Sequence, residues 1–393
     1  MKQGYLSEYF VDVAFKRLSA VEAHRHRSNQ HEFDGVGALR NIFGSERKTF
    51  QAIFIYLNDE DPEPVKDAGF LTWYDAREAH PTRSEYRLYF PDTDVTDNAN
   101  EGDLLVIGRR RDDTLLVIVA DSGSTIENQL VWLFGGQDLV NSAFVVQEEK
   151  QADQVRLQFA SRYILQQIGV ELRETAEDSL DVMLKKFGGT FPPTKIFSAF
   201  AREDFGPANL GDPDQVILSW MEREEILFRT LERHMISDRL QAGFGGDVDA
   251  FIKFSLSVQN RRKSRAGSAL ENHLEYLFGG LRIQHSRTPI TEGRAKPDFV
   301  FPSQSKYHDE RFPTSLLTVL GVKSTCKDRW RQVLAEADRV PEKHLLTLEP
   351  GISENQTNEM QAKGLQLVLP KALHSSYRDS QKKWLFSVAD FLA

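Results

Sequence analysis

A charged segment followed by a Gly/Pro-rich segment divides the chain into two halves with different hydrophobic patterns. The charged part reads ELRETAEDSL (171–180) and the second part reads FGGTFPPTK (187–195), a composition typical of connections. The chain has 393 residues, which is long for one hydrophobic core. We therefore predict two domains, residues 1–175 and 201–393, joined by a hinge at residues 176–200.

The first half has the pattern of a mostly β domain. TFQAIFIYL (49–57) and SEYRLYFP (84–91) are β-rich runs bounded by turn formers, and DLLVIGRRRDDTLLVIVADS (103–122) reads as two strands around a polar turn. STIENQLVWLF (124–134) and QVRLQFASRYILQQIG (154–169) instead carry the i, i+3, i+4 apolar spacing of helices.

The second half has an α/β order. Helical patterns are expected at 214–242, 266–278 and 328–339, and two strands should lie around Asp298 and Lys323. HLLTLEPGIS (344–353) and GLQLVLP (364–370) read as further buried strands. Helices and strands that alternate in this way form an α/β domain.

Composition excludes several classes of protein. A hydrophobic content of 40% with 27% charged residues is typical of a soluble globular protein. The first 13 residues lack the apolar core of a signal peptide, and no run approaches the length of a membrane span. The single cysteine, Cys326, rules out an internal disulfide and a cysteine-cluster zinc site. We expect a cytoplasmic protein without a membrane partner.

The net charge of -9 argues against a generic nucleic-acid binder, although local basic clusters still allow a DNA footprint. Two such clusters stand out: NRRKSRAG, with Arg261, Arg262, Lys263 and Arg265, and KDRWR, with Lys327, Arg329 and Arg331. The plain alternative for each cluster is a solvated face.

Asp298 and Lys323 are the candidates for chemistry. Asp298 follows a proline and opens the apolar run DFVF, and Lys323 closes LLTVLGVK. Metal-assisted hydrolysis of a phosphodiester uses carboxylates that hold Mg²⁺, and it gains from a lysine near the attacking water. Gly321 stands two residues before the lysine, where nucleases of this kind usually have their second carboxylate. The alternative is a plain core sheet.

The neighbouring helical patterns offer replacement carboxylates. In DRWRQVLAEAD (328–338), Glu336 and Asp338 flank the apolar stripe on opposite sides, and the helical wheel does not choose between them. In SALENHLEYLF (268–278), Glu271 and Glu275 share one face next to the buried stripe. The alternative for this last pair is an ordinary surface pair.

The motifs SVQNRRKSRAGSALENHLEYLF, ITEGRAKPDFVFPS, YHD and VKSTCKDRWRQVLAEAD closely resemble the catalytic half of EcoRII-like type II restriction endonucleases, over roughly residues 205–385. This group belongs to the PD-(D/E)XK superfamily. The resemblance implies a restriction-endonuclease-like α/β fold in the C-terminal domain. It also implies that Asp298 and Glu336 bind Mg²⁺, that Lys323 assists the nucleophilic water and that Glu271 is a supporting carboxylate of the site.

The same resemblance implies the residues that recognise DNA. In this group a charged triplet before the last helix of the site reads G·C pairs, which here would be Lys327, Asp328 and Arg329. An acidic side chain can accept a hydrogen bond from cytosine, and basic side chains can donate hydrogen bonds to guanine. Relatives recognise CC(N/W)GG-like sites in double-stranded DNA. His308 and Asp309 of YHD also match, and we interpret them as structural residues.

In the first half, FKRLSA (15–20) and PTRSEYRLYF (81–90) resemble the effector-binding domain of the same group, which is a B3-like barrel. Arg83, Glu85 and Arg87 would alternate along one face of a strand and contact DNA. The alternative is a ladder of charge pairs facing solvent.

The sequence thus favours a homodimeric, Mg²⁺-dependent endonuclease acting on a near-palindromic site, with an N-terminal domain that binds effector DNA and regulates cleavage. The rival interpretation is a DNA-binding regulator or phage-defence sensor in which the N-terminal domain dominates.

Overall fold

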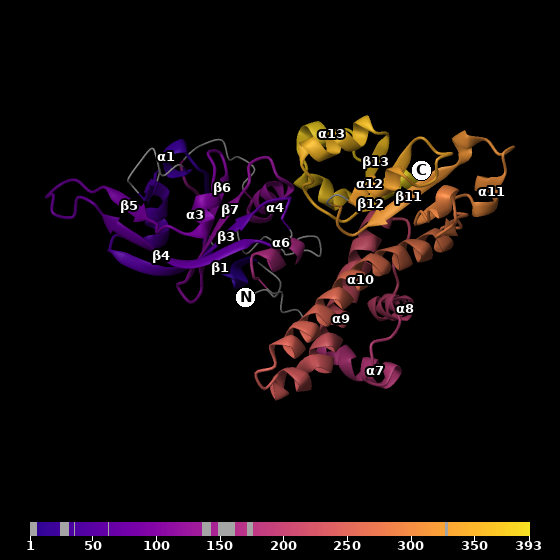
Figure 1. The fold of residues 1–393 in the computed structure, drawn as a ribbon, viewed down its shortest axis with the longest axis horizontal. Helices are drawn as coiled ribbons and strands as arrows, with labels where there is room; N and C mark the ends of the chain where they lie inside the picture. The colour runs from indigo at the N-terminus through magenta and orange to yellow at the C-terminus, as the bar shows by residue number, and fades with distance from the viewer. Residues whose placement is uncertain are drawn as a thin grey trace. The chain divides into compact units, whose positions relative to one another are not determined.

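The computed structural model describes residues 6–23, 31–34, 36–61, 63–135, 143–147, 162–170, 176–326 and 329–393. The chain forms two compact units, shown in Figure 1. Unit 1 consists of Met1–Arg173 with Pro350–Ser353, and unit 2 of Glu174–Glu349 with Glu354–Ala393. Across these described ranges, no helix has both the length and the apolar character needed to cross a membrane.

Unit 1 is built on one large sheet. Its strands lie in the order β2-β5-β4-β3-β7-β6-β1-β8, and all neighbours are antiparallel except β3 and β7. The bounds are β1 Phe10–Arg17, β2 Glu32–Phe33, β3 Lys48–Leu57, β4 Val65–Asp75, β5 Tyr86–Tyr89, β6 Leu104–Arg110, β7 Leu115–Ala120 and β8 Val145–Gln147. The strands expected in this half are confirmed. With β2 and β8 at opposite ends of the order, the described strands form a curled half-barrel, and the closed B3-like barrel is not confirmed.

Both faces of this sheet are buried at its centre. Leu115, Val117 and Val119 of β7 belong to one apolar cluster, and the alternate residues Leu116 and Ile118 belong to the other. Such a strand reads as a continuous apolar run because neither face meets water. The expected helix α4 (Thr125–Phe134) and the short helix α6 (Arg162–Gln167) contribute to the second cluster. Most of the longer helix expected at 154–169 lies outside the described residues.

The remaining helical elements of unit 1 are short. They are α1 Ala20–Ala23, α2 Arg40–Phe43, α3 Asp94–Asn98 and the 3₁₀ turns Leu6–Glu8 and Val36–Leu39.

The segment expected to be a hinge, residues 176–200, is largely helical and packed. It contains α7 (Glu177–Phe187) and the start of α8 (Thr194–Phe205). Met183 and Phe197 are buried with Phe228 and Leu231 of α9. Glu177 and Asp178 are exposed in the first turn of α7, and Gly188 and Gly189 follow its last residue, so the hinge prediction is wrong for this segment.

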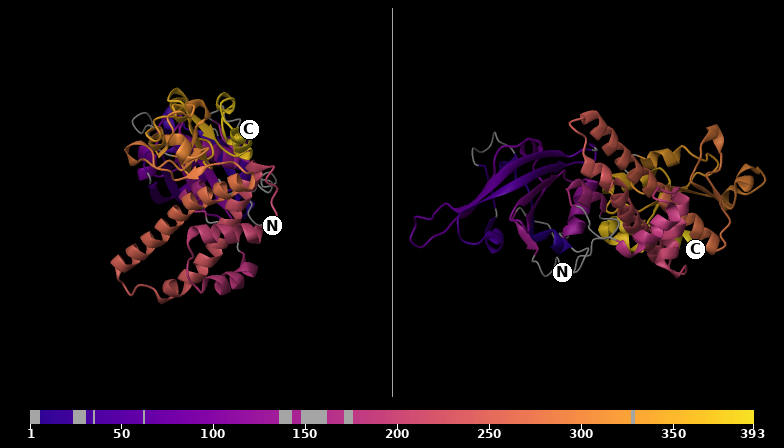
Figure 2. Two further views of the ribbon diagram at one scale, coloured as in Figure 1. Left: turned by 90° about the vertical axis from the view of Figure 1, so that its right-hand side faces the viewer. Right: turned by 90° about the horizontal axis from the view of Figure 1, so that it is seen from below.

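Two long helices form the spine of unit 2 and lie side by side (Figure 2). They are α9 (Pro213–Ala242), as expected, and α10 (Val248–Gly280), which begins well before the expected helix at 266–278. The side chain of Asp212 caps α9 by accepting from the N–H of Gln215, and Asp247 caps α10 by accepting from the N–H of Ala250. Each cap satisfies a backbone N–H that has no partner within the helix.

The sheet of unit 2 has the order β13-β12-β11-β10-β9. β9, β10 and β11 are antiparallel, whereas β11, β12 and β13 are parallel, which confirms an α/β domain. The strands are β9 Ser286–Arg287, β10 Phe299–Phe301, β11 Thr318–Lys323, β12 Lys343–Thr347 and β13 Leu365–Val368. The other elements are α11 Gln304–His308, α12 Trp330–Leu334, α13 Glu354–Ala362, α14 Asp379–Lys382, α15 Val388–Leu392 and the 3₁₀ turns Glu292–Arg294, Thr314–Leu316 and Lys371–Ser376.

Gly321 of β11 is the contact point between the sheet and α12. A Cβ at this position would lie 2.5 Å from Cγ2 and 3.0 Å from Cγ1 of Val333. Val333 is completely buried, so it has no free space into which it could move. Only glycine therefore lets α12 lie this close to β11, and a carboxylate at position 321 would displace the helix.

We expect Gly321→Ala to lower the free energy of unfolding by about 1–3 kcal/mol, because overpacking a filled core forces side chains off their rotamers. Urea denaturation measures the change. The double variant Gly321→Ala, Val333→Ala should lose less free energy of unfolding than the two single variants lose together, since the smaller residue at 333 removes the clash. Strict additivity would show that the two positions do not constrain each other.

Candidate active site

Asp298 and Lys323 meet at one edge of the unit 2 sheet. Asp298 precedes β10 and Lys323 ends β11, and the antiparallel register that pairs Phe299 with Leu320 brings these two strand ends together. The Nζ atom of Lys323 lies 3.0 Å from Oδ2 of Asp298. The same oxygen accepts from the N–H of Val322 at 2.6 Å. The pairing expected from the two strand ends is therefore present.

Glu336 faces this pair from the turn after α12. Its side chain is half-buried, and its pKa is raised by burial and by the negative charge of Asp298, while Lys323 and Lys343 oppose the shift. The prediction that a helix carries this residue is wrong, because α12 ends at Leu334. The following turn, and not a helical flank, directs Glu336 toward the sheet edge.

Asp338, the alternative to Glu336, is exposed. Its backbone N–H donates to Glu292, and its carboxylate acts on the pKa of Lys343. The structure therefore favours Glu336 as the second carboxylate beside Asp298.

Glu271 of α10 lies beside the same group and has a cationic partner that the sequence did not reveal. Its Oε2 accepts from Arg287 of β9 at 2.9 Å, and Arg287 also binds Glu275 at 2.9 Å. Burial raises the pKa of Glu271, and the charge of Asp298 adds to the shift, whereas Arg287 and Lys323 oppose it. Glu271 and Glu275 are therefore joined through Arg287 and are not an independent surface pair.

Lys343 is a second residue that sequence reasoning missed. It is buried at the start of β12, and burial lowers its pKa while the charges of Asp338, Glu292 and Glu336 oppose that shift. The sequence showed only a lysine before an apolar strand, a position that is exposed in most proteins, so nothing marked it.

The carboxylates fit a divalent cation that completes its shell with water and substrate oxygens. Oε2 of Glu336 is buried and has no hydrogen-bond partner among the described residues. A buried carboxylate oxygen without a donor is costly unless a cation binds it. Within the described ranges, no cluster of three or more His, Cys, Asp or Glu side chains could enclose a metal. Asp298 and Glu336 thus suit Mg²⁺, which usually takes one or two carboxylates and keeps several waters.

The triplet expected to read DNA is only partly described. Lys327 and Asp328 lie outside the described residues. Arg329 is exposed immediately before α12, and its backbone N–H donates to the carbonyl of Cys326 at 2.8 Å. Its side chain is therefore accessible to a partner.

The basic segment of α10 differs from the expectation. Arg265 is buried and forms ion pairs with Glu224 and Glu225 of α9, so its assignment as a DNA-binding residue is wrong. Arg262 is half-buried and pairs with Glu232 at 2.6 Å. These arginines hold α10 against α9, because buried carboxylates need a cationic partner.

Of the other two basic residues of this segment, Arg261 is half-buried and Lys263 is exposed. Arg261 lies over the ring of Phe191, with 4.2 Å from the guanidinium carbon to the ring centroid.

In unit 1, the expected row of Arg83, Glu85 and Arg87 is not a row on one strand. β5 begins at Tyr86, so Arg83 and Glu85 precede it. Arg87 is paired with Glu85 at 2.8 Å and with Glu32 at 2.7 Å. Glu85 and Arg87 therefore follow the charge-pair alternative, and Arg83 is exposed.

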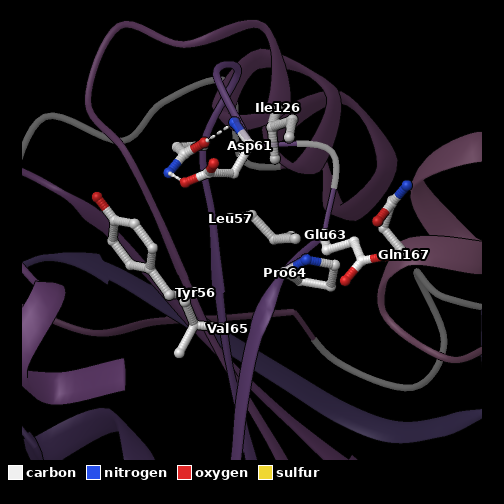
Figure 3. Close-up of a pocket in the computed structure, with 9 residues that line it drawn as sticks. Tyr56, Leu57, Asp61, Glu63, Pro64, Val65, Ile126 and Gln167 are labelled. Carbon is white, nitrogen blue, oxygen red and sulfur yellow. Dashed lines mark hydrogen bonds between the residues drawn. The ribbon is translucent and has the colours of Figure 1, made fainter. Parts of the chain in front are cut away.

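A small hollow in unit 1 lies at the ends of β3 and β4, as Figure 3 shows. It is lined by Tyr56, Leu57, Asn58, Asp61, Glu63, Pro64, Val65, Ile126 and Gln167. Asn58 and Asp61 are hydrogen-bonded to each other. Because two carboxylates and no cation line it, this hollow does not suit a phosphate, and the sheet edge of unit 2 is the better candidate site.

We expect Arg265→Ala to lower the free energy of unfolding by about 3–5 kcal/mol, because it removes the cationic partner of two buried carboxylates. Lys263→Ala, two residues away but exposed, is the matched control and should change it by less than about 0.5 kcal/mol. Urea denaturation compares the two. A small effect of both changes would contradict the structural role of Arg265.

Comparison with known proteins shows sequence similarity in the region that contains this site. A family model described as EcoRII C terminal matches residues 228–392, a range that includes Glu271, Asp298, Lys323 and Glu336. The type II restriction enzyme EcoRII of Escherichia coli is 40% identical over 226 residues, which cover 57% of this chain and 55% of EcoRII. The similarity therefore spans about half the length of that relative.

Two solved structures are also similar. Metal-depleted Ecl18kI in complex with uncleaved, modified DNA covers 56% of this chain and 83% of that one, at 20% identity and a TM-score of 0.45. The complex of restriction endonuclease PspGI with substrate DNA covers 51% of this chain and 90% of the PspGI chain, at 16% identity and a TM-score of 0.42. Residues 228–392 of this chain match the model of the EcoRII C-terminal family, and this similarity is carried by the sequence match alone.

Proposed function

We propose that the chain is a Mg²⁺-dependent, sequence-specific endonuclease that hydrolyses phosphodiester bonds of double-stranded DNA. The observation that carries this proposal is the convergence of Asp298, Lys323 and Glu336 at one sheet edge. These residues lie in the region that matches the EcoRII C-terminal family. A sheet core alone does not need a half-buried Glu336 whose pKa is raised by burial and by the charge of Asp298, so the plain structural alternative leaves this arrangement unexplained.

Each residue would have a separate chemical role. Bound by Asp298 and Glu336, Mg²⁺ would lower the pKa of the attacking water and stabilise the charge on the phosphate. The ammonium of Lys323 can only donate hydrogen bonds, so it would hold that water by its oxygen or contact a phosphate oxygen. Glu271, which is held by Arg287, would help to orient the same water by accepting a hydrogen bond from it. The water would give up a proton to solvent as its oxygen adds to phosphorus, the bond from phosphorus to the leaving oxygen would break, and that oxygen would take a proton from solvent.

Sequence recognition would depend on the residues that precede α12. We assign direct base contacts to Lys327, Asp328 and Arg329, at a short CC(N/W)GG-like site. Lys263, which is exposed on α10, and the half-buried Arg261 would bind the phosphate backbone, with a smaller contribution from the paired Arg262. A homodimer would match the two-fold symmetry of such a site.

The N-terminal half would regulate cleavage as a B3-like module that binds effector DNA. Arg83 is the accessible cation of its expected contact set, and Glu85 and Arg87 would contribute only if their ion pairs opened. The rival function, a DNA-binding regulator or phage-defence sensor, needs this half alone. The intact set of Asp298, Lys323 and Glu336 in unit 2 favours the nuclease.

The active-site assignment predicts the relative cleavage rates of four variants. Asp298→Ala, Lys323→Ala and Glu336→Ala should each lower the cleavage rate in Mg²⁺ by about 100-fold or more, since each removes a preorganised charge at the reacting phosphate. Asp338→Ala is the matched control for Glu336→Ala and should cleave nearly as fast as the unchanged chain. Single-turnover cleavage of a cognate duplex measures all four. A slower Asp338→Ala than Glu336→Ala would reverse the choice of carboxylate.

The regulatory assignment predicts that unit 2 alone is the faster enzyme on DNA with one site. The fragment should begin at Glu174, because α7 belongs to the core of unit 2. A second cognate duplex added in trans should accelerate the full chain, since DNA bound to the N-terminal half would favour a state of the chain in which that half does not restrain cleavage. Arg83→Ala should weaken this response. Equal rates for fragment and full chain, without acceleration, would contradict regulation by the N-terminal half.

A further inference from the structure

The turn that carries Glu336 has an unusual backbone that other residues must hold. α12 ends at Leu334, and Ala337 has a φ of 55°, a left-handed conformation that costs free energy for a residue with a Cβ. Ala337 is nevertheless 1% exposed and packs with Val300, Leu317 and Val340. The apolar contacts fix the middle of the turn, but they do not by themselves fix the direction of Glu336.

Glu292 provides the first polar attachment of this turn. Its Oε2 accepts from the N–H of Asp338 at 3.2 Å and from the hydroxyl of Tyr307 at 2.5 Å. Burial raises the pKa of Glu292, but the hydrogen bonds from Tyr307, from its own backbone N–H and from Asp338, together with the charge of His308, lower it overall. Glu292 is therefore held as a carboxylate between the two partners.

Tyr307 and Arg339 provide the second attachment. The hydroxyl of Tyr307 accepts from the N–H of Arg339 at 3.3 Å. The guanidinium of Arg339 donates back to the carbonyl of Tyr307 and to the carbonyls of Asp309 at 3.2 Å and Phe312 at 3.0 Å. Tyr307 is completely buried, so both attachments share one immobile anchor.

The position of Glu292 in the chain connects the two candidate metal ligands. It lies in the loop between β9 and β10, which ends at Asp298. At the far end of that loop, the N–H of Thr288 donates to the carbonyl of Asp298 at 2.9 Å. The loop that positions Asp298 therefore also holds the turn that positions Glu336.

We propose that Glu292, Tyr307 and Arg339 form a clamp that sets the spacing between Asp298 and Glu336 and so determines how tightly the pair binds a divalent cation. They are positioning residues, because none of them reaches the reacting atoms. This inference rests on the proposed metal-dependent function. It also gives YHD a role: Tyr307 anchors the clamp, while His308 and Asp309 support its backbone, His308 through Nε2 at 2.9 Å from the carbonyl of Ile290.

The test uses the full chain and two measurements. The first is the Mg²⁺ concentration that gives half of the maximal cleavage rate. The second is direct binding of Mn²⁺, followed by electron paramagnetic resonance without DNA. Glu292→Ala and Tyr307→Phe should each raise the half-maximal Mg²⁺ concentration and lower the affinity for Mn²⁺, both by about 10-fold or more. This is the usual effect of losing a residue that orients a metal ligand. The maximal rate at saturating Mg²⁺ should fall much less.

Two further variants separate positioning from general stability. Glu292→Gln keeps an oxygen that accepts from Asp338 and Tyr307, so its metal affinity should return close to that of the unchanged chain. Glu310→Ala removes an exposed carboxylate near the same segment and should change neither measurement. Glu292 lies on an exposed turn, so its variants test the clamp even where Tyr307→Phe fails to fold.

The outcomes distinguish this inference from the proposed function. If the unchanged chain binds Mn²⁺, and Glu292→Ala and Tyr307→Phe bind it with the same affinity, the clamp is overturned but the proposed function is not. A lower melting temperature without a change in metal affinity would also overturn it, because that is the result of a purely structural role. If the unchanged chain and Asp298→Ala bind Mn²⁺ equally, the metal site itself is wrong and the proposed function fails with it.

Discussion

The close packing of Val333 against Gly321 is the contact on which the candidate site depends. It lets α12 lie directly on β11, and the turn after α12 then delivers Glu336 to the end of that strand. A carboxylate placed on β11 itself, at position 321, would need a Cβ where the methyl groups of Val333 stand. The same arrangement therefore excludes a second carboxylate on the strand, and our proposal assigns that role to Glu336 on the helix side. On this proposal, the absence of a carboxylate at position 321 is a consequence of packing.

The parts of the fold that the sequence predicted are those with local signals. β3, β6 and β7 follow from dense runs of β-branched and aliphatic residues, and α9 follows from a long apolar stripe with a capping Asp and a following Pro. Asp298 and Lys323 were found because Asp298 opens one apolar run and Lys323 closes another, so the strands alone place them at a sheet edge. The choice of Glu336 over Asp338 came only from resemblance, because the helical wheel assumed a helix that continues past Leu334.

What the sequence did not reveal depends on contacts between distant residues. A run of arginines on α10 has the same composition whether it faces DNA or carboxylates, and only the packing of α10 on α9 shows that Arg265 faces Glu224 and Glu225. Arg287 and Lys343 carried no local signal for the same reason. The segment at 176–200 has the composition of a linker, yet Met183 and Phe197 give it enough apolar surface to join the core. Composition describes what a segment exposes, and burial is decided by its neighbours.

The central claim is that this sheet edge cuts DNA at a defined sequence with Mg²⁺. The most direct measurement is digestion of a sequenced plasmid by the full chain, with Mg²⁺ or with EDTA, followed by sequencing of the ends. The account predicts discrete fragments only with Mg²⁺, whose ends all lie at one short, near-palindromic, CC(N/W)GG-like sequence. An intact plasmid at saturating Mg²⁺, cleavage that persists in EDTA, or ends scattered without a common sequence would contradict it.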